Sequence, residues 1–127
     1  MALREGFHTV TPYLTSTNVN ALVKFTEHAF GAIETHREEM GPGRFHVEIR
    51  IGDSMVMIGG SPDTTPVTGM LYLYVDNVDA AYKRALDAGA TSVQEPRDTP
   101  DGERRGGVRD AFGNLWFFGQ SKTQTSS

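Results

Sequence analysis

The chain has no cysteine among its 127 residues, and this absence removes two classes of structure. Disulfide bonds and thiolate metal sites both require cysteine, so a metal ion would have to be held by His, Asp or Glu. Proteins without disulfides are typical of reducing compartments. We therefore expect a cytoplasmic location.

Long apolar runs and clusters of positive charge are also missing. No stretch approaches the roughly 20 apolar residues that cross a membrane, and residues 1–6 lack the apolar segment of a secretory signal. The formal net charge is -4, with 12 Lys and Arg against 16 Asp and Glu. Because nucleic-acid-binding surfaces are usually basic, we expect neither a membrane nor a nucleic acid as partner.

What the sequence does contain is one pattern that occurs twice. Residues 18–21 (Asn-Val-Asn-Ala) are matched by residues 77–80 (Asn-Val-Asp-Ala), and Gly31-Ala32 is matched by Gly89-Ala90. In each copy the Asn is a favourable helix N-cap and the Gly a favourable helix stop. A period of this size indicates a duplicated supersecondary unit rather than a solenoid of short repeats.

The first copy predicts the order β-α-β-β-β. Residues 44–51 alternate between apolar and polar side chains, which is typical of a strand with unlike faces. Pro12 lies inside the first predicted strand and cannot donate a ladder hydrogen bond, so that strand is expected at a sheet edge or bulged. The predicted strands are 9–14, 32–37, 44–51 and 55–58, with a helix from 19 to about 30.

The second copy follows a linker, because residues 59–69 hold three glycines and two prolines without periodicity. We expect strands at 70–75, 91–95, 108–109 and 115–118, a helix from 78 to 88, a polar loop at 96–103 and a frayed tail at 120–127. The chain is therefore assigned to the α+β class. One domain, residues 1–127, would contain two tandem βαβββ modules at about 7–59 and 69–119.

The stretch from Gly106 to Gly119 is a predicted strand, tight turn and strand. Its Asp-x-x-Gly-Asn turn, followed by an aromatic strand, resembles the C-terminal signature of the vicinal oxygen chelate superfamily. That superfamily includes glyoxalase I, the extradiol dioxygenases and the bleomycin-resistance proteins, and the similarity is greatest to its small PhnB-like branch. The resemblance covers nearly the whole chain. It implies curved mixed sheets around a cavity shared between the modules, and a homodimer.

In the metalloenzymes of that superfamily, His or Glu on the first and last strand of each module holds a divalent ion. Carried over one at a time, these positions fall on Pro12, on Met57 or Ile58, on Met70 and on Phe117. None of these side chains offers the nitrogen or oxygen donors that Zn²⁺, Fe²⁺ or Mn²⁺ would need here. This departure from the family's pattern predicts a member with no metal and no cofactor, and it argues against metal catalysis of the family type.

Two other groups could carry chemistry. His8, His46 and Glu48 would form a two-His, one-carboxylate set if their strands presented them to the same side. Arg104-Arg105 could bind an anion, or could be exposed charge in a turn. Both alternatives stay open at this stage.

The predicted cavity lining is aromatic. Leu71 and Leu73 have the character of a helix-packing face, which leaves Met70, Tyr72 and Tyr74 on the other face of their strand. Phe117 would lie opposite, whereas Trp116 and Phe118 have the other parity and are expected in the core. The candidate ligand-binding residues are Pro12, His46, Glu48, Met57, Met70, Tyr72, Tyr74 and Phe117.

Such a lining suits a flat, partly apolar small molecule. We therefore expect a metal-free small-molecule-binding protein, by resemblance to the branch that gives antibiotic resistance through sequestration. The alternatives are a metal-dependent lyase, isomerase or dioxygenase that uses unidentified ligands, and a dimeric scaffold or regulatory module. A further possibility is that the side chains fill the cavity themselves.

Overall fold

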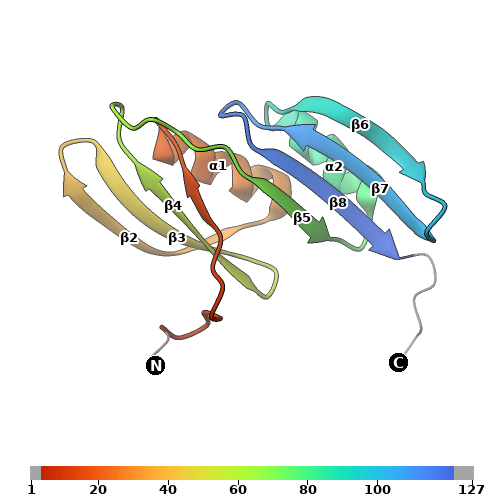
Figure 1. The fold of residues 1–127 in the computed structure, drawn as a ribbon, viewed down its shortest axis with the longest axis horizontal. Coiled ribbons are helices and arrows are strands. Elements are labelled where there is room, and N and C mark those ends of the chain that lie inside the picture. The colour runs from red at the N-terminus through yellow and green to blue at the C-terminus, as the bar shows by residue number, and fades with distance from the viewer. Residues whose placement is uncertain (1–3, 122–127) are drawn as a thin grey trace. The chain divides into compact units, whose positions relative to one another are not determined.

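Each half of the chain folds into one helix and a four-stranded mixed sheet (Figure 1). The computed structural model describes residues 4–121, and the chain divides into two units, Met1–Thr68 and Gly69–Ser127. This architecture confirms the predicted α+β class and the two βαβββ modules. The predicted cavity shared between the modules stays a prediction.

In the N-terminal unit the strands are ordered β1-β4-β3-β2, with β1 parallel to β4 and the other pairs antiparallel. The prediction of an edge strand is confirmed, although β1 begins after Pro12 rather than at residue 9. The Pro12 carbonyl still accepts a hydrogen bond from the Met57 amide at 2.9 Å. The elements are β1 (Tyr13–Thr15), α1 (Val19–Phe30), β2 (Ile33–Gly41), β3 (Arg44–Ile51) and β4 (Ser54–Gly60).

The C-terminal unit repeats this arrangement in the order β5-β8-β7-β6, again with the first strand parallel to its neighbour. Its elements are β5 (Met70–Tyr74), α2 (Val78–Asp87), β6 (Thr91–Asp98), β7 (Glu103–Arg109) and β8 (Leu115–Ser121). Both helices begin as predicted. The Asn18 and Asn77 side chains accept from the amides of Ala21 and Ala80, and Gly31 ends α1 with φ 69°.

The polar loop predicted at 96–103 is wrong, because β6 and β7 extend into it. Pro96 is tolerated on β6 since this strand lies at the sheet edge and its pairing is irregular between Gln94 and Arg97. Gly106 and Gly107 belong to β7, which begins earlier than the strand predicted at 108–109. The Phe117 ring lies so close above Gly107 that a Cβ there would come within 2.5 Å of it.

The tail predicted from residue 120 is also wrong at its start, because β8 continues to Ser121. The Gln120 side-chain oxygen accepts a hydrogen bond from the Val78 amide at 3.0 Å and so satisfies a free amide at the start of α2. The rest of the predicted tail lies outside the described residues.

The core of each unit lies between its helix and one face of its sheet. In the N-terminal unit, the buried face carries Leu14, Val47, Ile49 and Ile58. In the C-terminal unit, Val108, Trp116 and Phe118 are fully buried, which confirms the predicted core position of Trp116 and Phe118. The opposite face of each sheet carries most of the candidate site residues.

The signature turn is held together by Asp110. Its carboxylate accepts hydrogen bonds from the amides of Phe112 and Asn114 and, at 2.8 Å, from the Trp116 indole nitrogen. The Asp-x-x-Gly-Asn pattern therefore ties the turn to the core of its own unit. Among residues 4–121, no helix is long and apolar enough to span a membrane.

Candidate functional site

The strand registers relate the two units residue by residue. Tyr13 pairs with Met57 as Tyr72 pairs with Phe117, and the β3–β4 and β7–β8 ladders extend the correspondence. Equivalent positions on the helix-free faces are Tyr13 and Tyr72, His46 and Arg105, Glu48 and Gly107, Met57 and Phe117, and Gly59 and Gly119.

This register decides where the family's metal positions lie. Met57, not Ile58, is equivalent to Phe117, and Ile58 is fully buried in the core. Counting back from Tyr13 and Tyr72, Met70 corresponds to Thr11 rather than to Pro12. The assignment of Pro12 as the counterpart of Met70 is therefore corrected. Pro12 lies one residue closer to its helix cap than Met70 does.

The residues at these positions do not fit the family's metal ion. Met57, Met70 and Phe117 provide no hard donor, and the Thr11 hydroxyl donates to the His8 carbonyl at 3.2 Å. The alternative set is not assembled either, since His8 is exposed ahead of β1 while His46 contacts Glu48. Within residues 4–121, no three His, Asp or Glu side chains are grouped as metal ligands would be.

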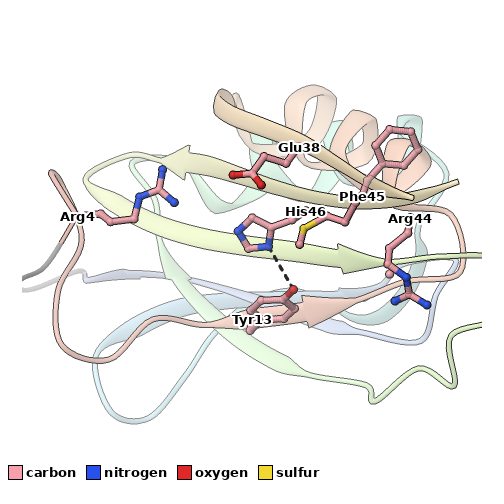
Figure 2. A pocket seen from close by; sticks show the side chains of 8 residues that line it. Arg4, Tyr13, Glu38, Arg44, Phe45 and His46 are labelled. Carbon is pink, nitrogen blue, oxygen red and sulfur yellow. Dashed lines mark hydrogen bonds between the residues drawn. The ribbon is translucent and has the colours of Figure 1, made fainter. Parts of the chain in front are cut away.

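A cavity of about 370 Å³ opens on the helix-free face of the N-terminal sheet (Figure 2). It is polar at its centre, where Tyr13 from β1 and His46 from β3 point toward each other (Figure 2). Arg4 lies at one side and Glu38 from β2 above them (Figure 2). The lining residues are Arg4, Tyr13, Glu38, Met40, Arg44, Phe45, His46 and Gly60.

A chain of hydrogen bonds leads from this cavity into the protein. The Tyr13 hydroxyl lies 3.3 Å from His46 Nδ1, and His46 Nε2 lies 3.0 Å from Glu48 Oε2. The guanidinium of Arg4 donates to the same carboxylate oxygen at 2.7 Å. Glu48 is only 1% exposed, so these hydrogen bonds replace the solvent contacts that its side chain loses on burial.

Glycine makes room for the tyrosine in this chain. Gly59 lies under the Tyr13 ring, and a Cβ there would collide with the Tyr13 hydroxyl. The ring is therefore held beside His46, with the two ring centroids 5.7 Å apart. Above them, a hydrogen bond from His36 to Glu38 at 2.8 Å lowers the pKa of the Glu38 carboxyl.

The helix-free face of the C-terminal unit is aromatic. Met70, Tyr72 and Tyr74 are 64%, 41% and 71% exposed, and the two tyrosine rings lie 5.3 Å apart. Phe117 lies beside Tyr72 in the ladder, with its ring over Gly107. The structure thus brings Met70, Tyr72, Tyr74 and Phe117 to one sheet face. His46, Glu48 and Met57 lie on the equivalent face of the N-terminal unit.

The tyrosine hydroxyls of the aromatic face converge on Glu103. Tyr72 donates to Glu103 Oε1 at 2.6 Å and Tyr74 to Oε2 at 3.1 Å, while Arg105 Nε donates to the Tyr72 oxygen at 3.0 Å. Burial, and then the bond to Glu103, raises the pKa of Tyr72. These bonds hold both rings in fixed positions.

The arginine pair that could have bound an anion is occupied by carboxylates. Arg104 makes two bonds to Asp79 and one to Asp98, and Arg105 contacts Asp101 and Glu103. Sequence reasoning missed Arg4, Tyr13 and Glu103 as parts of the two sites. The repeat could have revealed Tyr13, because it matches Tyr72 at the same spacing as the helix caps.

Comparison with known proteins agrees with this geometry. A model of the Glyoxalase/Bleomycin resistance protein/Dioxygenase superfamily matches residues 6–118. Protein Mb0911c of Mycobacterium bovis is 36% identical over 126 residues, covering 87% of this chain and 82% of the relative.

Solved structures share the fold. TioX from Micromonospora sp. ML1 has 28% identity and a TM-score of 0.75, covering 89% of this chain and 98% of TioX. The PhnB protein of Bacillus cereus, at 16% identity, has a TM-score of 0.71 with 90% and 100% covered, which supports the fold alone. On this evidence the chain belongs to the Glyoxalase/Bleomycin resistance protein/Dioxygenase superfamily.

Proposed function

We propose that this protein binds a small, flat, partly apolar molecule and needs no metal ion to do so. The observation that carries the proposal is the aromatic face of the C-terminal unit, formed by Met70, Tyr72, Tyr74 and Phe117. Large side chains that only support folding are normally buried, as Trp116 and Phe118 are here. On the aromatic face they stay accessible instead.

The tyrosines of this face are prepared for stacking. Both hydroxyls are bound to Glu103, so the rings lose little further conformational freedom when a ligand arrives. Aromatic stacking contributes about 0.5–1.5 kcal/mol per pair beyond the burial of apolar area. Met70 adds a flexible, polarisable side chain that adapts to ligands of different outline.

The decisive experiment is a thermal-shift screen of the wild type against aromatic antibiotics and metabolites, followed by titration of the hits. Tyr74→Ala should weaken binding of a hit severalfold, because the most exposed ring of the face is lost. The matched control is Tyr82→Ala on α2, a tyrosine that donates to Ser92. Equal loss in both variants, or no hit in the screen, would contradict the proposal.

Metal independence is tested separately. Elemental analysis of protein purified without chelator or metal-affinity resin should show well under one transition-metal ion per chain. This follows from the donor-poor positions Thr11, Met57, Met70 and Phe117. A near-stoichiometric signal that disappears with His46→Ala or Glu48→Ala would instead support the metal-dependent enzyme.

We further propose that the protein is a homodimer. Several large apolar side chains of the N-terminal unit are exposed, among them Ile33 on the edge strand β2, Met40 and Val67. Burying such side chains is the main source of stability in dimer interfaces. Sedimentation at micromolar concentration should give twice the subunit mass of 13.9 kDa; a monomer alone would remove the claim.

A further inference from the structure

The segment before β1 is attached to its sheet at few points, and one of these points is a buried carboxylate. We propose that residues 4–12 form a strap that opens and closes over the helix-free face of the N-terminal sheet, and that the ion pair between Arg4 and Glu48 is its latch. Opening the strap would expose the Glu48 carboxylate to solvent. The strap is independent of the proposed function, because none of its residues belongs to the aromatic face of the C-terminal unit.

The latch joins an exposed cation to a buried carboxylate. Arg4 Nη1 donates to Glu48 Oε2 at 2.7 Å, and the two side chains are 55% and 1% exposed. Figure 2 shows Arg4 extending toward the sheet from the segment that precedes β1. Because Arg4 is already partly solvated and His46 also contacts Glu48, Arg4 can leave without stripping the carboxylate of all its partners. The latch can therefore open while the sheet stays folded.

Glu48 is buried on a face that is otherwise open. On β3 it shares the helix-free side with His46 and Arg50, whereas Val47 and Ile49 point into the core. The His46 side chain is half-buried and Arg50 is exposed. Arg4 from the strap lies against Glu48 between them, so closing the strap helps to remove that carboxylate from water.

The rest of the strap is held loosely. The ladder to β4 begins only at Pro12, whose carbonyl accepts from the Met57 amide at 2.9 Å. Before that point the backbone bonds to itself, from the Phe7 amide to the Arg4 carbonyl at 3.0 Å, and the Val10 side chain is 85% exposed. Segments with few buried contacts and an exposed backbone open at a small cost in free energy.

Two contacts guide the strap back to its closed position. Gly6, at φ 85°, turns the chain beside β4, where a Cβ on this residue would lie 3.8 Å from the Met55 side chain. The Arg4 guanidinium lies over the Phe7 ring, 5.9 Å from its centroid, and this cation–π contact orients the arginine. The closed strap is thus a defined arrangement that depends on one strong polar contact.

The test follows the strap and the carboxylate separately in the full chain. Chymotrypsin cleavage after Phe7, identified by mass spectrometry, measures how often the strap opens, because cleavage of a locally opened segment follows the population of the open form. Labelling by a water-soluble carbodiimide and an amine measures the exposure of the Glu48 carboxylate. Wild type should show slow cleavage at Phe7 and slow labelling of Glu48, with rapid labelling of the exposed Glu39.

Three variants decide the assignment. Arg4→Gln removes the charge of the latch and should raise both rates by about tenfold or more, as expected for the loss of a hydrogen bond to a charged group. Arg4→Lys keeps the charge and should raise them less. The matched control Arg37→Gln removes an arginine that is ion-paired with Glu34 in the same unit, and it should leave both rates unchanged.

The proposal is overturned if Arg4→Gln is cleaved and labelled as the wild type is, or if wild-type Glu48 is labelled as fast as Glu39. It is also overturned if Arg4→Gln lowers the melting temperature and raises cleavage throughout the chain, because Arg4 would then stabilise the whole unit rather than the strap. Failure of Tyr74→Ala to weaken ligand binding concerns the proposed function alone.

Discussion

The two units place different side chains at equivalent positions on the same framework. Where the N-terminal unit has Glu48 beside Met57, the C-terminal unit has Gly107 beside Phe117. The first pair is a buried carboxylate held by Arg4, and the second is an aromatic ring lying over bare backbone. These are two of the positions at which the helix-free faces of the two units differ.

A second pair of positions is similar in both units. A tyrosine lies over a glycine next to a basic residue in each, as Tyr13 over Gly59 beside His46 and as Tyr72 over Gly119 beside Arg105. The basic group beside the tyrosine is an imidazole in the N-terminal unit and a guanidinium in the C-terminal unit. The duplicated scaffold therefore keeps its backbone geometry and differs in the side chains that surround each tyrosine.

The largest difference in stability between equivalent substitutions in the two units is expected in the core. Trp116→Ala should destabilise the protein by about 3–5 kcal/mol, because it leaves a large cavity and removes the indole donor from Asp110. Its equivalent, Val56, is smaller and also buried, so Val56→Ala should have a smaller effect. Urea unfolding measures both.

Phe117→Ala separates the two roles of a ring in the same strand. If Phe117 lies on an accessible face, Phe117→Ala should lower the free energy of unfolding clearly less than Trp116→Ala does. If both substitutions shift the urea midpoint equally, Phe117 fills space in the core, and the proposal that it belongs to a ligand-binding face is wrong.

Removal of the buried carboxylate is the next largest effect. Glu48→Ala should destabilise the protein by about 1.5–3 kcal/mol, the usual contribution of hydrogen bonds to charged groups, since both Arg4 and His46 lose their partner. Arg4 is partly exposed and can be resolvated, which limits the loss. Glu48→Gln keeps the shape and should fall between wild type and Glu48→Ala. If Glu48→Ala leaves the free energy of unfolding unchanged, the chain of hydrogen bonds is not formed in solution.

A new methyl group sharpens the comparison between the faces. Gly107→Ala brings a Cβ against the Phe117 ring and should destabilise by about 1–3 kcal/mol, as overpacking does. In the double variant with Phe117→Ala the clash is gone, so the two effects should be strongly non-additive. Additive values in a double-mutant cycle would place the ring elsewhere.

The smallest expected effect is the loss of stability at acidic pH. Hydrogen bonds from Arg104 lower the pKa of Asp79, and those from Arg37 lower the pKa of Glu34. Each ionised carboxylate therefore stabilises the fold at pH values above its pKa in the unfolded chain, which is 3.8 for Asp and 4.5 for Glu. That stability is lost as pH falls below these values through the lower folded pKa. The melting temperature should therefore drop slightly between pH 6 and pH 3, and Arg104→Gln should drop less. Because both pairs are largely exposed, the change is small.

The sequence by itself determined the architecture of this protein. The matched caps Asn18 and Asn77, the alternation of residues 44–51 and the turn at Asp110 predicted both modules, because these signals are local and need no distant partner. The extent of β6, β7 and β8 was missed. Pro96 is tolerated at an irregular sheet edge, Gly107 leaves room for the Phe117 ring, and Gln120 contacts the start of α2.

The sites were decided by tertiary structure. Sequence placed Tyr72, Tyr74 and Phe117 on one face by parity, but the register of β1 against β4 was needed to replace Pro12 by Thr11 and to choose Met57 over Ile58. Only the folded N-terminal unit brings Arg4, Tyr13 and His46 to Glu48, from segments far apart in the chain. A buried carboxylate needs hydrogen-bonding partners in place of water. A sequence pattern does not show which distant residues will lie within hydrogen-bond distance of it.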